Sequence, residues 1–174
     1  GAPRPFQMGL PALDLFPRAI WARLMGRRLR QQTRFDLMLP EPSGEASLKQ
    51  AIADYLRFSR SIDCQPEQIF ITSGYAASMT LILQTLASPG EGIWMEDPGF
   101  PLIRPVIEEQ QLALNPVPVD EPGMDITAGM AQCLHARFAL LPPAHQTPLG
   151  VALSVSRRRQ LLDWPAPHTA CLIG

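Results

Sequence analysis

The chain has 174 residues, of which 46% are hydrophobic and 18% are charged. This length and composition fit one soluble globular domain with a sizeable core. A net charge of −1 gives no field that would attract nucleic acid or an anionic membrane. No apolar run approaches the roughly 18 residues of a membrane-spanning helix, and the three cysteines and three histidines are too dispersed to suggest a metal site. We expect a cytoplasmic protein with reduced thiols.

Two helices are predicted in the first 60 residues. The first covers residues 14–31, with Pro17 in its first turn and an apolar stripe along its length. Arginines 27, 28 and 30 on this helix could form a phosphate-binding patch, but a solvated helix face is the simpler interpretation. The second helix covers residues 46–59, and its apolar side chains repeat at a spacing that predicts one buried face. They are Leu48, Ala51, Ile52, Tyr55 and Leu56.

Strands and helices then alternate to the end of the chain. The predicted strands cover residues 68–72, 93–96, 112–119, 138–141 and 170–173. The predicted helices cover residues 75–87, 102–111, 126–134 and 155–163. The first of these helices is apolar nearly all round, which predicts that it is buried, and Ser154 is a suitable cap for the last. The alternation predicts an α/β fold with a mostly parallel sheet.

Three short segments follow predicted strands, at the places where α/β proteins bind ligands. The segments are Ser73-Gly74-Tyr75-Ala76, Glu96-Asp97-Pro98-Gly99-Phe100 and His145-Gln146-Thr147-Pro148-Leu149-Gly150. The first places free backbone amides and the positive end of a helix together, which suits a phosphate, although such a segment is also an ordinary connector. Phe100 alone could equally be a core phenylalanine at a helix start, and the third segment alone is a polar loop.

In this order, the three segments resemble the pyridoxal 5'-phosphate (PLP) site of fold-type I aminotransferases. The second and third are most similar to the aminotransferase-like effector domain of MocR-type regulators in the GntR family. The resemblance covers nearly all of the chain, including residues 6–21 and Pro42-Ser43-Gly44. It implies part of a fold-type I large domain, with a mostly parallel sheet flanked by helices. Residues 1–45 would be an N-terminal arm and first helix, and residues 46–174 part of the cofactor-binding domain.

The resemblance also implies roles at the first segment and beyond it. Ser73, Gly74, Tyr75 and Ala76 would hold the cofactor phosphate. The family often has glutamine at the position of Tyr75, which leaves the contribution of that side chain open. Arg104 would meet a substrate carboxylate or phosphate, with a plain surface arginine as the alternative.

Two further segments are implied to contact the cofactor ring. Phe100 would stack on the pyridine ring. Thr147 lies opposite an asparagine that, in ordinary aminotransferases, bonds the phenolic oxygen of the cofactor. His145 or Gln146 could do this work instead. Cofactor binding is therefore predicted at these four positions.

The sequence also departs from the family pattern. Leu39 stands where the family commonly has a tyrosine that reaches the phosphate of the neighbouring subunit. The family's pyridinium-pairing aspartate and Schiff-base lysine would follow Gly174, and the only lysine here is Lys49. We therefore predict no catalytic residue, no transamination by this chain, and weak non-covalent PLP binding at most. Two strands of the family's sheet would also be missing, so we expect the chain to be marginally stable or oligomeric.

Three hypotheses follow. In the first, the chain is a fragment of a MocR-like regulator, whose intact form would be a homodimer that binds DNA through an N-terminal winged-helix domain. A small amino compound or PLP would be its effector. In the second, it is a fragment of a free-standing class I/II aminotransferase. In the third, it is an unrelated doubly wound domain that binds another phosphate ligand.

Overall fold

The computed structural model describes residues 11–39, 41–142, 144–164 and 170–174. Residues 6–10 of the resembling N-terminal stretch, and Pro143 before the third segment, lie outside the described residues. The chain divides into two compact units, residues 1–71 and 72–174. The division at residue 45 implied by the family falls inside the first unit and stays a prediction.

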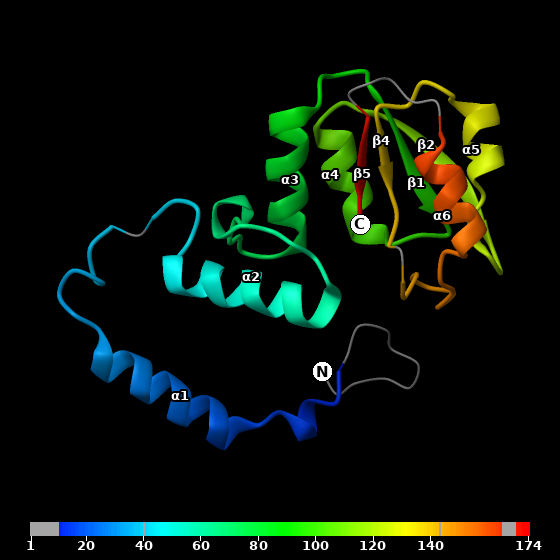
Figure 1. The fold of residues 1–174 in the computed structure, drawn as a ribbon. Coiled ribbons are helices and arrows are strands. Elements are labelled where there is room, and N and C mark those ends of the chain that lie inside the picture. Colours follow the sequence, from blue (N-terminus) through cyan, green and yellow to red (C-terminus); the bar gives the residue numbers. More distant parts are fainter. Residues whose placement is uncertain (1–10, 40, 143, 165–169) are drawn as a thin grey trace, which may run out of the picture. The chain divides into compact units, whose positions relative to one another are not determined.

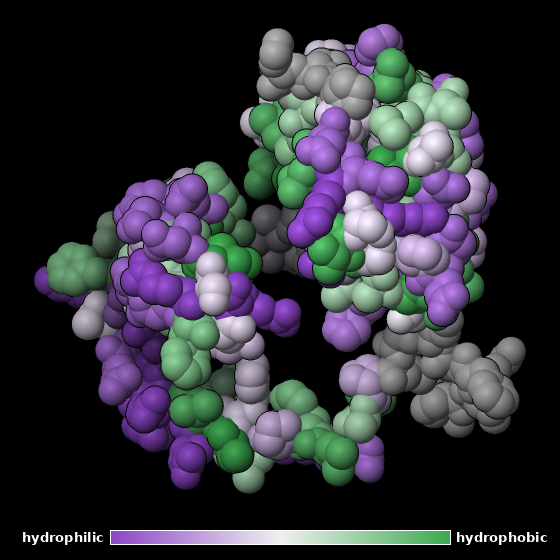
Figure 2. All heavy atoms as spheres, turned by 45° about the vertical axis from the view of Figure 1, so that its right-hand side comes forward, coloured by the Kyte–Doolittle hydropathy of each residue, from purple (hydrophilic) through white to green (hydrophobic). Residues whose placement is uncertain are grey.

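The first unit contains both predicted helices, α1 (Arg18–Gln31) and α2 (Ala46–Arg60), with short 3-10 turns at Leu13–Leu15 and Pro66–Gln68. α1 buries none of its residues, and α2 buries only Ala53, although one buried face was predicted for α2. In the predicted buried face of α2, Leu48 is 45% exposed and Tyr55 62% exposed. The periodicity correctly shows an apolar face, but burial also requires a surface to cover it. Apolar side chains of both units are visible at the surface in Figure 2.

Residues 68–72 do not form the predicted strand. Residues 66–68 form a 3-10 turn, and Ile71 makes a single backbone bond, in which its amide donates to the Ser43 carbonyl (2.9 Å). A strand needs a hydrogen-bonded ladder, which this lone bond does not provide. The turn at Gly44 allows the close approach. Its φ is +109°, and a Cβ atom there would lie 2.3 Å from Ile71 Cγ1.

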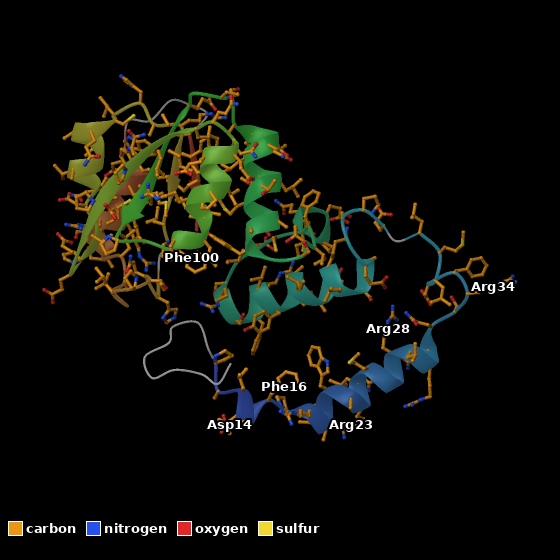
Figure 3. The ribbon with its side chains drawn as sticks, turned by 180° about the vertical axis from the view of Figure 1, so that it is seen from behind. Asp14, Phe16, Arg23, Arg28, Arg34 and Phe100 are labelled. Atoms are coloured by element: carbon orange, nitrogen blue, oxygen red, sulfur yellow. The ribbon has the colours of Figure 1, made fainter. Side chains whose placement is uncertain are left out.

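The arginines of α1 are consistent with a solvated helix face. Arg28 forms an ion pair with Glu45 (3.2 Å), in which both side chains are about half exposed. Figure 3 shows Arg23 and Arg28 on this helix. Exposed pairs of this kind contribute little to stability.

The second unit is built on a five-stranded sheet of order β3-β2-β1-β4-β5. The strands are β1 (Gly92–Asp97), β2 (Ala113–Asp120), β3 (Gly123–Met124), β4 (Phe138–Leu140) and β5 (Cys171–Ile173). β1 pairs in parallel with β2 and β4, and β4 with β5, while only β3 is antiparallel. The mostly parallel sheet is thus confirmed. β3 was missed because two residues are too short for a periodic signal.

Helices cover both faces of this sheet (Figure 1). α3 (Tyr75–Leu86) and α4 (Arg104–Glu109) lie on one face, and α5 (Ile126–Gln132) and α6 (Val155–Leu162) on the other. Two apolar clusters result, one with Met79, Ile93 and Phe138, the other centred on Trp94. Trp94 stacks on Trp164 with ring centroids 4.1 Å apart. α3 buries only Met79 and Leu83, so the prediction of a fully buried helix is wrong.

Side chains fix the ends of the helices on the second face. Ser154 accepts a hydrogen bond from the Arg157 amide (3.3 Å), as predicted, and Asp125 caps α5 in the same way. Arg157 also donates to both carboxylate oxygens of Asp120 (2.5 and 2.6 Å) and to the Gly123 carbonyl. This clamp ties α6 to the β2–β3 hairpin. No helix among the described residues is long and apolar enough to span a membrane.

Candidate functional site

A cavity of about 280 Å³ opens in the second unit, where β1, β4 and β5 end. It is close to the lower end of the usual range for small-molecule pockets, about 300–1,000 Å³. Ligands of open α/β sheets bind at this carboxyl edge of the strands. The lining residues are Tyr75, Met95, Glu96, Phe100, Ile103, Leu140, Leu141, Pro142, His145, Thr147 and Gly174.

Four of the predicted site residues meet at this cavity: Tyr75, Phe100, His145 and Thr147. They come from all three predicted segments. The rings of Tyr75 and Phe100 lie edge to face, with centroids 5.8 Å apart. Phe100, which is labelled in Figure 3, comes after β1 in the sequence and is 42% exposed. It is therefore not a buried core phenylalanine, and the cavity has an accessible aromatic wall.

Ser73, Gly74 and Ala76 do not line the cavity but flank Tyr75 at the start of α3. Gly74 is the N-cap residue with φ +131°, and a Cβ atom there would have no neighbour within 4 Å. Among the described residues, no side chain caps this helix. The Thr72 and Ser78 hydroxyls lie 2.6 Å apart and brace the turn. The first amides of α3 thus remain open to an anion.

Gln146, a predicted cofactor-binding residue, is 3% exposed and does not line the cavity. Its contact with a cofactor stays a prediction. Its side-chain nitrogen donates to the Pro98 carbonyl (2.8 Å), and its side-chain oxygen accepts from the Leu149 amide (2.9 Å). Gln146 therefore ties the loop that carries His145 and Thr147 to the turn after β1.

Arg104 is the first residue of α4 and is exposed, and it does not line the cavity. The structure therefore shows it as a surface arginine. Its contact with a substrate stays a prediction.

The sequence reasoning missed Glu96 as a site residue. Glu96 is among the residues that line the cavity, although it is only 5% exposed. Burial raises its pKa to about 7, and the side chain of Gln146 opposes this shift. Burial likewise raises the pKa of Tyr75. The available signal was a carboxylate directly after the apolar run Ile93-Trp94-Met95, at the end of a central strand.

The geometry agrees with the comparison to known protein families. The model of the family "Aminotransferase class I and II" matches residues 12–168. The chain belongs to this family. The resemblance to MocR-type regulators is confirmed by the curated relatives of this aminotransferase domain. One is a probable rhizopine catabolism regulatory protein, MocR, of Rhizobium meliloti, 30% identical over 168 residues. That match covers 97% of this chain and 34% of the relative.

Another relative is the pyridoxine biosynthesis transcriptional regulator PdxR of Corynebacterium glutamicum. It is 35% identical over 130 residues, which cover 75% of this chain and 28% of the relative. The chain thus spans about a third of the length of these curated relatives.

The solved structures confirm the fold-type I aminotransferase fold. The α-aminoadipate aminotransferase LysN of Thermus thermophilus is 27% identical, with a TM-score of 0.79. The match covers 91% of this chain and 40% of LysN, which was solved with N-(5'-phosphopyridoxyl)-L-leucine.

Proposed function

We propose that this chain is part of the PLP-binding, effector-sensing domain of a bacterial transcription regulator. The observation that carries the proposal is the meeting of Tyr75, Phe100, His145 and Thr147 at one cavity on the carboxyl edge of the sheet. Family membership and the regulator relatives support it. In the intact protein, DNA binding, dimerisation and response to a small amino compound or to PLP itself would complete the function in the cytoplasm.

The start of α3 fits the phosphate of such a cofactor. Gly74 leaves space around the backbone, and the first helix amides have no side-chain cap among the described residues. A helix N-terminus of this kind favours a phosphate through its free donors and its dipole. We propose that the backbone of Ser73, Gly74 and Ala76 binds the phosphate. Tyr75 lies between these residues in the sequence and also lines the cavity that would hold the ring.

The cavity itself fits an aromatic ring. The ring of Phe100 can stack on a ligand ring, and Tyr75 contacts Phe100 edge to face. Thr147 supplies a hydroxyl that can donate to the phenolic oxygen, and His145 supplies a second polar group on the same loop. Gln146 keeps this loop in place. A few polar groups within an apolar wall are what orient a small ligand.

PLP, when bound, supplies an aldehyde and an electron-withdrawing ring. The lining residues of this cavity include no lysine that could react with that aldehyde. Lys49 lies in the first unit and donates to Ser43 Oγ (2.7 Å). We therefore propose that this chain holds the cofactor without a covalent bond and does not transaminate by itself.

A free-standing aminotransferase remains the alternative, because LysN shares the fold at 27% identity. The coding sequence upstream of this segment distinguishes the regulator from the enzyme. A winged-helix segment directly upstream supports the regulator, whereas an aminotransferase N-terminus supports the enzyme.

Cofactor binding is tested by calorimetric titration with pyridoxine 5'-phosphate, which has no aldehyde and cannot react with Lys49. We expect saturable binding that is lost with phosphate-free pyridoxine. Phe100→Ala and Thr147→Ala each weaken binding by about 3–10-fold, because each removes one ring or hydrogen-bond contact. Leu102→Ala, at an exposed neighbour outside the cavity, leaves binding unchanged. Equal losses in all three variants would contradict the proposed site.

A further inference from the structure

Glu96 is an unusual residue for the wall of this cavity. It lies on the central strand β1, opposite Val117 of β2, and only 5% of its surface is exposed. Hydrogen bonding by the Gln146 side chain lowers the pKa of Glu96, but burial has the larger, opposite effect. The Glu96 carboxyl is therefore only partly compensated for being removed from water. A buried carboxyl in this situation favours its neutral form.

The other charged or titratable groups around the cavity do not provide a cation that would hold Glu96 ionised. Across the described residues that line it, only Tyr75 and His145 also have ionisable side chains. Asp97, the last residue of β1, and Arg104, the first residue of α4, are exposed and do not line the cavity. The flanking strands bring apolar residues beside this part of β1, because Glu96 pairs with a valine of β2 and the preceding Met95 pairs with a leucine of β4.

An anionic ligand changes the energy of this carboxyl. A ligand that fills the cavity would displace the water that reaches Glu96, and its phosphate would add negative charge at the start of α3. Both effects disfavour the ionised carboxylate. A protonated Glu96 has no such conflict and can donate a hydrogen bond into the cavity.

From this placement we propose that the cavity binds its anionic ligand only when the Glu96 carboxyl is protonated. When that carboxyl is ionised in the free protein, binding is therefore accompanied by the uptake of one proton there. The inference rests on the proposed cofactor function and adds a specificity residue to it. Glu96 is a binding residue of the cavity, distinct from the loop position held by Gln146. Above neutral pH, the ionised carboxylate must regain its proton before the ligand binds. Its pKa of about 7 sets where this begins.

The test is the affinity for pyridoxine 5'-phosphate between pH 6 and pH 8.5, measured for the wild-type chain and for Glu96→Gln. Glutamine keeps the shape and a donor but cannot ionise. Both proteins bind the same ligand, so the pH dependence that comes from the ligand's own phosphate cancels in the ratio of the two dissociation constants. We expect a ratio near one at pH 6, and wild-type binding about tenfold weaker than that of the variant at pH 8, because each pH unit above the pKa costs about one decade.

His145 has the other ionisable side chain on the loop beside Glu96, so its contribution is tested separately. His145→Asn is therefore introduced both alone and together with Glu96→Gln, and the two resulting proteins are compared at pH 8. If the proposal is right, the double variant still binds about tenfold more tightly than His145→Asn alone. If the two proteins bind equally well, His145 is responsible and the proposal is overturned.

The remaining outcomes separate the inference from the proposed function. Saturable binding with the same pH dependence in wild type and Glu96→Gln overturns the inference alone. Weaker binding by Glu96→Gln at high pH also overturns it, since Glu96 would then act as an anion toward a cationic part of the ligand. Absence of binding by either protein at every pH overturns the proposed function and this inference together.

Discussion

The Glu96 carboxyl also makes the stability of the second unit depend on pH. Its pKa is about 7 in the folded chain, against 4.5 for the ordinary group, so the folded state binds more protons between these values. The free energy of unfolding therefore falls as pH rises through this window. The penalty is absent below about pH 4.5 and fully present above about pH 7.

Glu96→Gln removes this penalty. We predict that the variant is more stable than wild type at pH 8, by on the order of 2 kcal/mol after allowance for solvent in the cavity, and that the gain shrinks toward pH 5. Urea unfolding at several pH values measures the difference. Glu109→Gln, at an exposed site on α4, is the control and leaves the pH profile unchanged. A gain that is constant with pH would contradict the account.

Gln146 is the second residue whose role depends on packing. Gln146→Ala leaves the Pro98 carbonyl and the Leu149 amide without their partner. We predict a loss of about 2 kcal/mol in unfolding free energy and faster hydrogen exchange at the Leu149 amide. Gln132→Ala, at an exposed helix end, should cost little. Unchanged exchange at Leu149 would show that Gln146 does not hold the loop.

Residue positions were predictable where a motif fixes a side chain relative to a strand end. Phe100 and Thr147 are of this kind, since both follow strands that end at the same edge. Glu96 and Gln146 were not predictable in the same way, because their roles depend on which groups pack beside them. Nothing in the local sequence shows that a glutamine two residues from a proline will bond the backbone of a distant turn.

At the scale of elements, Arg157 ties α6 to the β2–β3 hairpin. Its side chain is 14% exposed and binds the Asp120 carboxylate in bidentate fashion, with Gly123 as a third acceptor. We predict that Arg157→Ala lowers the unfolding free energy by about 1–2 kcal/mol and couples to Asp120→Ala by about 1 kcal/mol in a double-mutant cycle. Arg159→Ala, which is exposed on the same helix, serves as the control. A coupling energy of zero would contradict the clamp.

The order of strands and helices was largely predictable at this scale, but the burial of the helices was not. Apolar periodicity identified α2 correctly and capping chemistry identified the start of α6. The exposed face of α2 and the half-exposed α3 show that apolar periodicity identifies an apolar helix face. It does not show whether another element packs against that face. Residues 68–72 carry strand-forming side chains, yet a strand also needs a hydrogen-bonded neighbour.

At the scale of the whole molecule, many large apolar side chains are exposed. They include Trp21 (55%), Phe58 (92%) and Leu172 (44%), the last on the edge strand β5. Exposed apolar surface and an unpaired strand edge both favour association. We therefore predict that the chain self-associates at micromolar concentrations, which sedimentation velocity over a concentration series will detect. A concentration-independent monomer with a high melting temperature would contradict this.

The central claim is that the three segments around Tyr75, Phe100 and Thr147 form one binding site for a vitamin B6 phosphate. Nuclear magnetic resonance titration of the labelled chain with pyridoxine 5'-phosphate tests it most directly. The account predicts saturable shifts, with one dissociation constant, at the amides of Gly74, Tyr75, Phe100 and Thr147. Shifts confined to one segment, or scattered over surfaces remote from the cavity, would contradict it.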